Sequence, residues 1–139
     1  MLGGTAERGR GTLGVMERVT GVGGFFFAAR DPEGLSRWYA DHLGVDVPPV
    51  DYDTSSWRQQ SGATVFAPTD AGSAELRATS HGWTLNFRVV SLDPMVEQLR
   101  RAGIEVAVDP ETYPNGRFAR LVDPEGNGIQ LWQAEGADS

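Results

Sequence analysis

Residues 116–132 read GRFARLVDPEGNGIQLW. The central Asp-Pro-Glu-Gly-Asn-Gly, residues 123–128, is typical of a tight turn, because Asp, Asn and Gly tolerate the backbone angles of turns and Pro fixes its own φ. The flanking runs, residues 117–122 and 128–133, are rich in branched and aromatic side chains, which favour strands. This stretch therefore predicts two strands joined by a turn.

The residues before this hairpin predict a strand, a helix and a further strand. Residues 84–90 alternate apolar and polar side chains, as a half-buried strand does. Asp93-Pro94 is typical of a helix start, with Asp as the N-cap and Pro at the first helical position, and Gly103 is typical of a helix end. Residues 104–108 predict another strand. The second half, residues 81–133, is thus expected to be a βαβββ module.

The first half, residues 18–67, repeats this order of elements. Residues 19–29 predict a strand, Asp31-Pro32 a helix start and Gly44 the helix end. Three short strand-like runs follow, at residues 45–50, 56–60 and 63–67. The expected fold class is α+β, with two βαβββ modules forming a curved mixed sheet cup and one helix per module.

Three segments lie outside the two modules. Residues 1–17 are expected to be a flexible leader in which Met16 is an alternative start, and residues 134–139 a polar tail. Residues 68–80 are expected to connect the modules, with a weak helical signal at 75–78. Residues 1–15 contain no apolar stretch typical of a secretory signal, and we expect a cytoplasmic protein.

The composition of the 139 residues excludes several function classes. The formal net charge of −7 and the pI of about 4.7 argue against general nucleic-acid binding, which needs a basic surface. The absence of cysteine excludes disulfides, thiolate metal sites and thiol nucleophiles. All basic residues are arginine, which excludes Schiff-base lysines. No apolar run approaches the roughly 20 residues of a membrane-spanning helix.

Strand parity separates two faces of the expected sheet. In residues 84–89, Leu85 and Phe87 point to one face, while Asn86 and Arg88 point to the other. We expect the apolar set to pack under the helices and the polar set to line the concave face of the sheets, the cup. Such a polar face has two interpretations, a solvent-exposed surface or a ligand cavity.

The doubled pattern resembles the vicinal oxygen chelate superfamily, also called the glyoxalase/bleomycin resistance protein/dioxygenase group. Residues 116–132 carry the strongest similarity, supported by residues 27–44, with Trp38-Tyr39 in the helix, and by the Asn86-Phe87-Arg88-Val89 strand. The resemblance covers about residues 18–133. It implies a homodimer, in some members with exchanged modules, and a cup close to the dimer interface.

Metal-dependent members of this superfamily carry ligands at four strand positions around the cup. The resemblance places these positions at Gly24 (or Gly23), at Val65 or Phe66, at Thr84 and at Gln130. Gly, Val and Phe side chains offer no donor atom, and Thr and Gln are poor ligands for divalent transition metals. We therefore expect no cofactor, although a divalent metal held by altered ligands is an alternative.

The sequence supports three hypotheses on function and assigns no catalytic residue. The first is a degenerate metal site in a protein that binds a small polar or anionic metabolite, with cup residues Thr84, Asn86, Arg88, Tyr113, Arg117, Gln130 and Trp132. The second is a metal-dependent lyase, isomerase or dioxygenase with altered ligands, in which His81, Glu75 and Gln130 would converge. The third is a drug-sequestering resistance protein.

The hypothesis of an anionic metabolite depends mainly on Arg88. An inward-facing guanidinium on a half-buried strand needs an anionic partner, either an internal carboxylate or a ligand. No acid occupies the matching inward positions Thr84, Asn86, Gln130 and Trp132. Neither a nucleic acid nor a membrane is expected as a partner.

Overall fold

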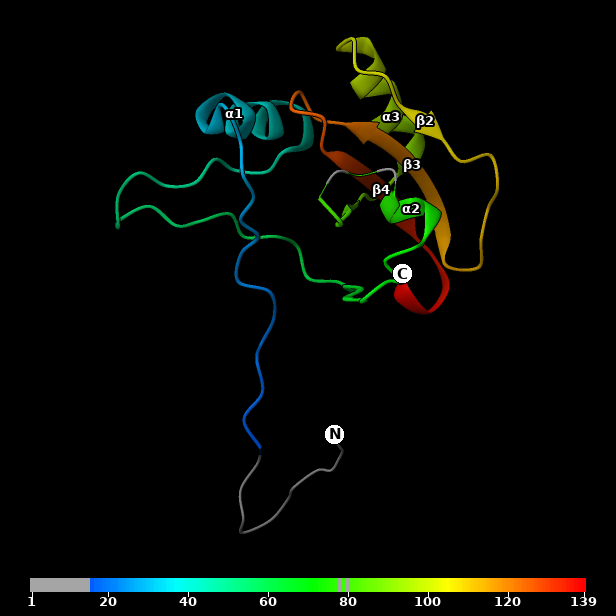
Figure 1. The fold of residues 1–139 in the computed structure, drawn as a ribbon, viewed down its shortest axis with the longest axis horizontal. Helices are drawn as coiled ribbons and strands as arrows, with labels where there is room; N and C mark the ends of the chain where they lie inside the picture. The colour runs from blue at the N-terminus through cyan, green and yellow to red at the C-terminus, as the bar shows by residue number, and fades with distance from the viewer. Residues whose placement is uncertain (1–15, 78, 80) are drawn as a thin grey trace.

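The computed structural model describes residues 16–77, 79 and 81–139. The expected leader, residues 1–15, and position 78 of the weak helical signal lie outside the described residues. The elements follow in the order shown in Figure 1: α1 (Pro32–Leu43), α2 (Ala74–Arg77), β1 (Leu85–Arg88), α3 (Leu92–Arg101), β2 (Ala107–Val108), β3 (Gly116–Val122), β4 (Gly128–Ala134) and the 3-10 turn η2 (Gly136–Asp138).

The four strands form one mixed sheet in the order β1-β4-β3-β2. β1 runs parallel to β4, whereas β3 runs antiparallel to both β2 and β4. The predicted turn joins β3 to β4, and the backbone N–H of Asp123 donates to the carbonyl of Asn127 at 2.9 Å. The strand–turn–strand prediction for residues 116–132 is confirmed.

The first predicted helix, α1, has the predicted boundaries. Asp31 is its N-cap, and the side chain accepts a hydrogen bond from the backbone N–H of Gly34 at 3.1 Å. Pro32 occupies the first helical position, where a missing N–H costs nothing. Gly44 ends the helix with φ of 74°, a left-handed conformation that glycine adopts without strain.

The second helix, α3, begins earlier than Asp93-Pro94 predicted. Its first residue is Leu92, after an extended Ser91 whose side chain makes no capping bond. The Leu92 N–H instead donates to the side-chain oxygen of Gln133 at 2.7 Å, so a neighbouring strand supplies the acceptor that a helix start needs. Asp93 consequently faces outward and pairs with Arg117 at 3.1 Å.

A single apolar core forms between the two longer helices and one face of the sheet. Its buried side chains come from α1, α3, the segment before β2, β3 and β4, namely Leu35, Tyr39, Leu92, Val96, Leu99, Val106, Ala119, Leu121, Ile129 and Leu131. The helix of the first half thus shares its core with the helix and the sheet of the second half. The other face of the sheet carries polar and aromatic side chains.

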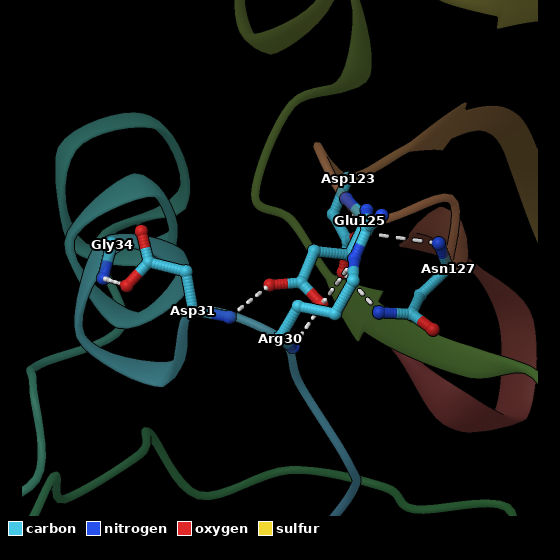
Figure 2. A network of polar contacts seen from close by, with 6 residues as sticks. All are labelled: Arg30, Asp31, Gly34, Asp123, Glu125 and Asn127. Atoms are coloured by element: carbon cyan, nitrogen blue, oxygen red, sulfur yellow. Dashed lines mark hydrogen bonds and ion pairs between the residues drawn. The ribbon is translucent and has the colours of Figure 1, made fainter.

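The DPEGN turn also holds α1 in place, as Figure 2 shows. The carboxylate of Glu125 accepts hydrogen bonds from the backbone N–H groups of Arg30 and Asp31, at 2.7 and 2.9 Å. The buried carboxylate of Asp123 accepts from the Tyr39 hydroxyl at 2.7 Å. Burial, together with this hydrogen bond, raises the pKa of Tyr39. Two acids of the turn therefore tie the first half to the second.

The strands predicted for the first half are not strands in the structure. Within residues 16–30 and 44–73, the described backbone forms no strand ladder, and Figure 1 draws these segments as long loops outside the sheet. Phe26 and Val50 are 94% and 98% exposed. A strand needs a hydrogen-bonded neighbour to exist as one, and the described part of the chain aligns none with these segments. The two-module organisation stays a prediction.

Two further segments refine the sequence predictions. The weak helical signal corresponds to the short helix α2. The expected tail begins inside β4, whose last residue is Ala134, and the N–H of Glu135 donates to the carbonyl of Asn115 at 3.0 Å. Among the described residues, no helix is long and apolar enough to span a membrane. The cytoplasmic localisation stays a prediction.

Candidate functional site

The polar side chains of β1 and β4 lie on one face of the sheet, as strand parity predicts. Asn86 lies opposite Gln130, and Arg88 lies opposite Trp132. The alternating residues Ile129 and Leu131 lie in the apolar core on the opposite face. We call the polar side the cup face; β3 adds Phe118 and Arg120 to it through pairing with Trp132 and Gln130.

The middle of the cup face carries a pair of amides. The Asn86 side-chain nitrogen donates to the Gln130 side-chain oxygen at 2.8 Å. Asn86 is exposed and Gln130 half-buried. This hydrogen bond holds both amides at the surface of the sheet, where they can offer donors and acceptors to a polar ligand.

Three aromatic rings extend along the same face from β4 across β3. The rings of Trp132 and Phe118 are parallel within 3°, with centroids 6.2 Å apart, and Tyr113 meets Phe118 edge-on at 5.8 Å. The Trp132 indole N–H donates to the carbonyl of Asn115 at 2.8 Å, and only 3% of the residue is exposed. Trp132, one of the predicted cup residues, is therefore enclosed by its neighbours and leaves little surface for a ligand.

Tyr113 lies at the end of this aromatic row, just before β3. Its hydroxyl donates to the carboxylate of Asp109 at 2.9 Å, and this hydrogen bond raises the pKa of Tyr113. The pKa of Asp109 is lowered, first by the N–H of Glu111 and then by the Tyr113 hydroxyl. Tyr113 thus reaches the aromatic part of the cup face with its hydroxyl already bonded to an acid.

Arg88 is the half-buried cation of the cup face. Its two terminal nitrogens donate to the carbonyls of Gln60, at 3.1 Å, and of Ser61, at 3.5 Å. Among the described residues, no carboxylate forms an ion pair with it; the ion pairs found there involve other arginines. The guanidinium thus has neutral hydrogen-bond partners, and no acid of the described part of the chain pairs with its charge.

Two predicted cup residues lie elsewhere. Arg117 is opposite Gln133 in the sheet, on the face that carries α3, and forms its ion pair with Asp93 of that helix. The prediction that Arg117 lies in the cup is therefore wrong, because the strand register places it on the opposite face. Thr84 lies one residue before β1 and is half-buried, so it borders the cup face without joining the ladder.

Phe118, Arg120 and residues 60–62 were not among the predicted cup residues. Alternation along the predicted 117–122 strand indicates that Phe118 and Arg120 share a face that excludes Arg117, and the register of β3 against β4 identifies this face as the cup face. Arg120 pairs with Glu75 of α2 at 3.6 Å. Nothing in the sequence indicates the approach of residues 60–62, which is a tertiary contact across more than 25 positions.

The side chains at the positions that the resemblance assigns to metal ligands are poor donors for a divalent metal. Gln130 already accepts a hydrogen bond from Asn86, and Val65 and Phe66 are exposed apolar side chains. The three residues of the altered-ligand hypothesis each have a different neighbour: Glu75 pairs with Arg120, Gln130 bonds Asn86, and His81 stacks on Trp83 at 4.6 Å. The described residues contain no group of three or more His, Asp and Glu side chains arranged to hold an ion.

Two surface hollows, of about 460 and 400 Å³, lie away from the polar centre of the cup face. The first is formed by α3 and Val108, and the second by the β1–α3 loop, α3, Leu43 and Arg88. Neither is lined by the Asn86–Gln130 pair. These two hollows therefore do not enclose the polar centre of the cup face.

Comparison with known proteins matches residues 24–132 to the model of a family described as glyoxalase-like domain. An antibiotic binding protein, TnmS3, from Streptomyces sp. CB03234 shares the fold, with 22% identity, a TM-score of 0.56, and coverage of 86% of this chain and 100% of the other. A putative glyoxalase family protein from Bacillus anthracis gives 21% identity and a TM-score of 0.49 over 78% of this chain and 88% of the other.

A glyoxalase/bleomycin resistance protein from Streptomyces sp. CB03234 is 37% identical over a shorter stretch, with a TM-score of 0.32. That match covers 35% of this chain and spans 42% of the length of the other protein. No curated protein matches the sequence.

Proposed function

The chain belongs to the glyoxalase-like domain family, and on this basis we propose that it binds a small anionic, oxygen-rich aromatic molecule on the cup face, with Arg88 as the residue that holds the anion. The proposal includes no resident metal, because the family ligand positions Gly24, Val65 or Phe66, Thr84 and Gln130 lack suitable donor atoms. The antibiotic binding protein described above has the same fold, which indicates that this fold can accommodate a small molecule.

The charge of Arg88 is the observation that carries the proposal. Arg88 is half-buried as a residue, and the neutral carbonyls of Gln60 and Ser61 replace only part of the hydration of its guanidinium. An arginine has five N–H donors, of which the carbonyls of Gln60 and Ser61 engage two. The others are enough for a bidentate bond to a carboxylate, the geometry that arginine forms best. On the same face, the Asn86–Gln130 pair offers polar groups at the position next to Arg88, and Phe118 lies one strand further away, beyond Trp132.

Replacing Arg88 by methionine is expected to weaken the binding of 2-naphthoate by roughly 10- to 100-fold, the worth of hydrogen bonds to a charged group. Methionine keeps most of the side-chain volume, so the sheet should remain folded. Isothermal titration calorimetry measures the affinity, and thermal unfolding monitors the fold.

Two controls test whether binding requires the charges of the ligand and of Arg88. 2-Naphthamide has the shape of 2-naphthoate without its charge and should bind the wild-type protein about tenfold more weakly. Arg101→Met removes an exposed arginine that pairs with Glu97 on α3 and should leave 2-naphthoate binding unchanged. Absence of binding to the wild type would contradict the proposed ligand class, and equal affinities for Arg88→Met and the wild type would show that Arg88 does not hold the anion.

A homodimer is the second part of the proposal. β1 is an edge strand of the sheet, and edge strands attract further strands. The extended segments of the first half expose many apolar side chains, among them Val19, Phe26, Val50, Val65 and Phe66. A soluble monomer rarely leaves so much apolar surface uncovered. A second copy of the chain would cover these side chains and add a second wall to the cup face.

Light scattering coupled to size exclusion is expected to give twice the chain mass of 15.0 kDa at micromolar concentration. Phe26→Asp combined with Phe66→Asp should shift the mass to that of one chain, because both exposed side chains would become charged in the interface. Val90→Asp, at an exposed apolar residue of the second half, serves as the matched control. A wild-type mass of 15 kDa would contradict the dimer.

A further inference from the structure

The guanidinium of Arg88 rests on three consecutive residues of the first half. Gln60 and Ser61 accept its hydrogen bonds through their backbone carbonyls. At the third residue, Gly62, a methyl group would lie 2.7 Å from the central guanidinium carbon and closer still to one terminal nitrogen. Only glycine leaves room for the guanidinium in the position observed.

The clash at position 62 involves the movable end of a long side chain. An alanine there can be accommodated if Arg88 rotates away, which costs the fold little but removes both carbonyl bonds. The backbone of Gly62 itself has no left-handed φ, so alanine introduces no backbone strain. The missing side chain at position 62 therefore determines where the guanidinium lies, and it has little bearing on whether the chain folds.

We propose that Gly62 is a positioning residue for the anion site: it allows the carbonyls of Gln60 and Ser61 to hold the Arg88 guanidinium in the orientation that receives the ligand. This inference rests on the proposed function of Arg88. It adds a part of the first half to a site otherwise built from β1, β3 and β4. A guanidinium held in advance loses less conformational freedom when the anion binds.

The reactivity of Arg88 tests this positioning without any ligand. Phenylglyoxal modifies accessible arginines, and peptide mass spectrometry gives the rate at each position. In Gly62→Ala, the Arg88 rate is expected to rise several-fold relative to that of Arg101 in the same sample. Gly23→Ala is the matched control, because no described atom lies within 4 Å of a methyl group at that position. An unchanged Arg88 rate in Gly62→Ala overturns the proposal.

Affinity for 2-naphthoate tests whether the position matters for binding. Gly62→Ala should bind it roughly tenfold more weakly, equivalent to one hydrogen bond to a charged group, with an unfolding temperature close to that of the wild type. In the Arg88→Met background the same substitution should have no further effect, because Gly62 acts through Arg88. An additional loss in that background would assign Gly62 a structural role, and tighter binding by Gly62→Ala would show that the carbonyls compete with the ligand.

The modification rate and the binding affinity together distinguish a failure of this inference from a failure of the proposed function. If the wild type does not bind 2-naphthoate but the Arg88 modification rate rises in Gly62→Ala, the proposed ligand class fails and the placement of Arg88 by Gly62 stands. If binding depends on Arg88 but not on Gly62, the proposed function stands and this inference fails.

Discussion

Replacing Asp123 by alanine is expected to lower the free energy of unfolding by about 3 kcal/mol or more, since several hydrogen bonds to one buried charged group are lost together. Asp123 is 3% exposed. One carboxylate oxygen accepts from the Tyr39 hydroxyl and the Asn127 side chain, both at 2.7 Å, and the other accepts the N–H groups of Glu125 and Asn127 at 2.8 and 3.0 Å. Alanine would leave all four donors without this acceptor.

Urea unfolding followed by circular dichroism measures this loss. Tyr39→Phe is the matched comparison: it removes one of the four hydrogen bonds and keeps the aromatic ring in the core. That variant is expected to lose only about 1–2 kcal/mol. Equal losses for the two variants would mean that the carboxylate does not organise the turn and serves only to bond Tyr39.

Replacing Gly116 by alanine is the second substitution with a large expected effect, a loss of about 3 kcal/mol from overpacking and backbone strain combined. Gly116 has φ of 135° at the start of β3. A methyl group there would overlap the backbone carbonyl of Gln133 and lie 2.9 Å from the indole nitrogen of Trp132. Because the first obstacle is backbone of the adjacent strand, a side-chain rotation cannot remove the clash.

Gly128→Ala is the matched control for this prediction, since it adds the same methyl group to a residue of the adjacent strand. No described atom lies within 4 Å of that methyl group, and Gly128 has no left-handed φ. Its unfolding free energy should stay within about 0.5 kcal/mol of the wild type. If Gly116→Ala and Gly128→Ala unfold at the same urea concentration, the close approach of β3 and β4 at Gly116 does not restrict this position.

The contrast between Gly62 and Gly116 follows from what each glycine touches. At Gly116 a side chain would meet the fixed backbone of a neighbouring strand, so the expected cost is in stability. At Gly62 it would meet the end of Arg88, so the expected cost is in the orientation of one functional group. The two substitutions should therefore separate in their measured effects, with unfolding affected at Gly116 and arginine reactivity at Gly62.

Local sequence patterns predicted those features that depend on neighbouring residues alone. The start of α1 at Asp31-Pro32 and its end at Gly44 follow from capping and left-handed preference. The turn between β3 and β4 follows from its Asp, Gly and Asn residues. The alternation of Asn86 and Arg88 with apolar residues placed both side chains on the correct face, because successive side chains of a strand point to opposite sides.

The candidate site was predictable only in part, since several of its contacts join distant segments. Arg117 was expected in the cup but pairs with Asp93, because the register of β3 against β4 determines its face. Trp132 was expected among the cup residues that contact a ligand but is buried beside Phe118. α3 begins at Leu92, before the predicted Asp93-Pro94 start, because Gln133, 41 positions away, supplies a hydrogen-bond acceptor for the Leu92 N–H.

The sequence by itself determined the helix α1, the β3–β4 hairpin, the two faces of the sheet and the family resemblance, because each depends on short-range backbone preferences or on a contiguous motif. Only the tertiary structure decided that α1 and α3 share one core, that Asp123 and Glu125 fasten the first half to the second, and that Arg88 lies on the carbonyls of residues 60–62. Each of these contacts joins residues that are far apart in the sequence, so it forms only when the intervening chain closes a long loop. Local sequence patterns describe neighbouring residues and therefore cannot predict such contacts.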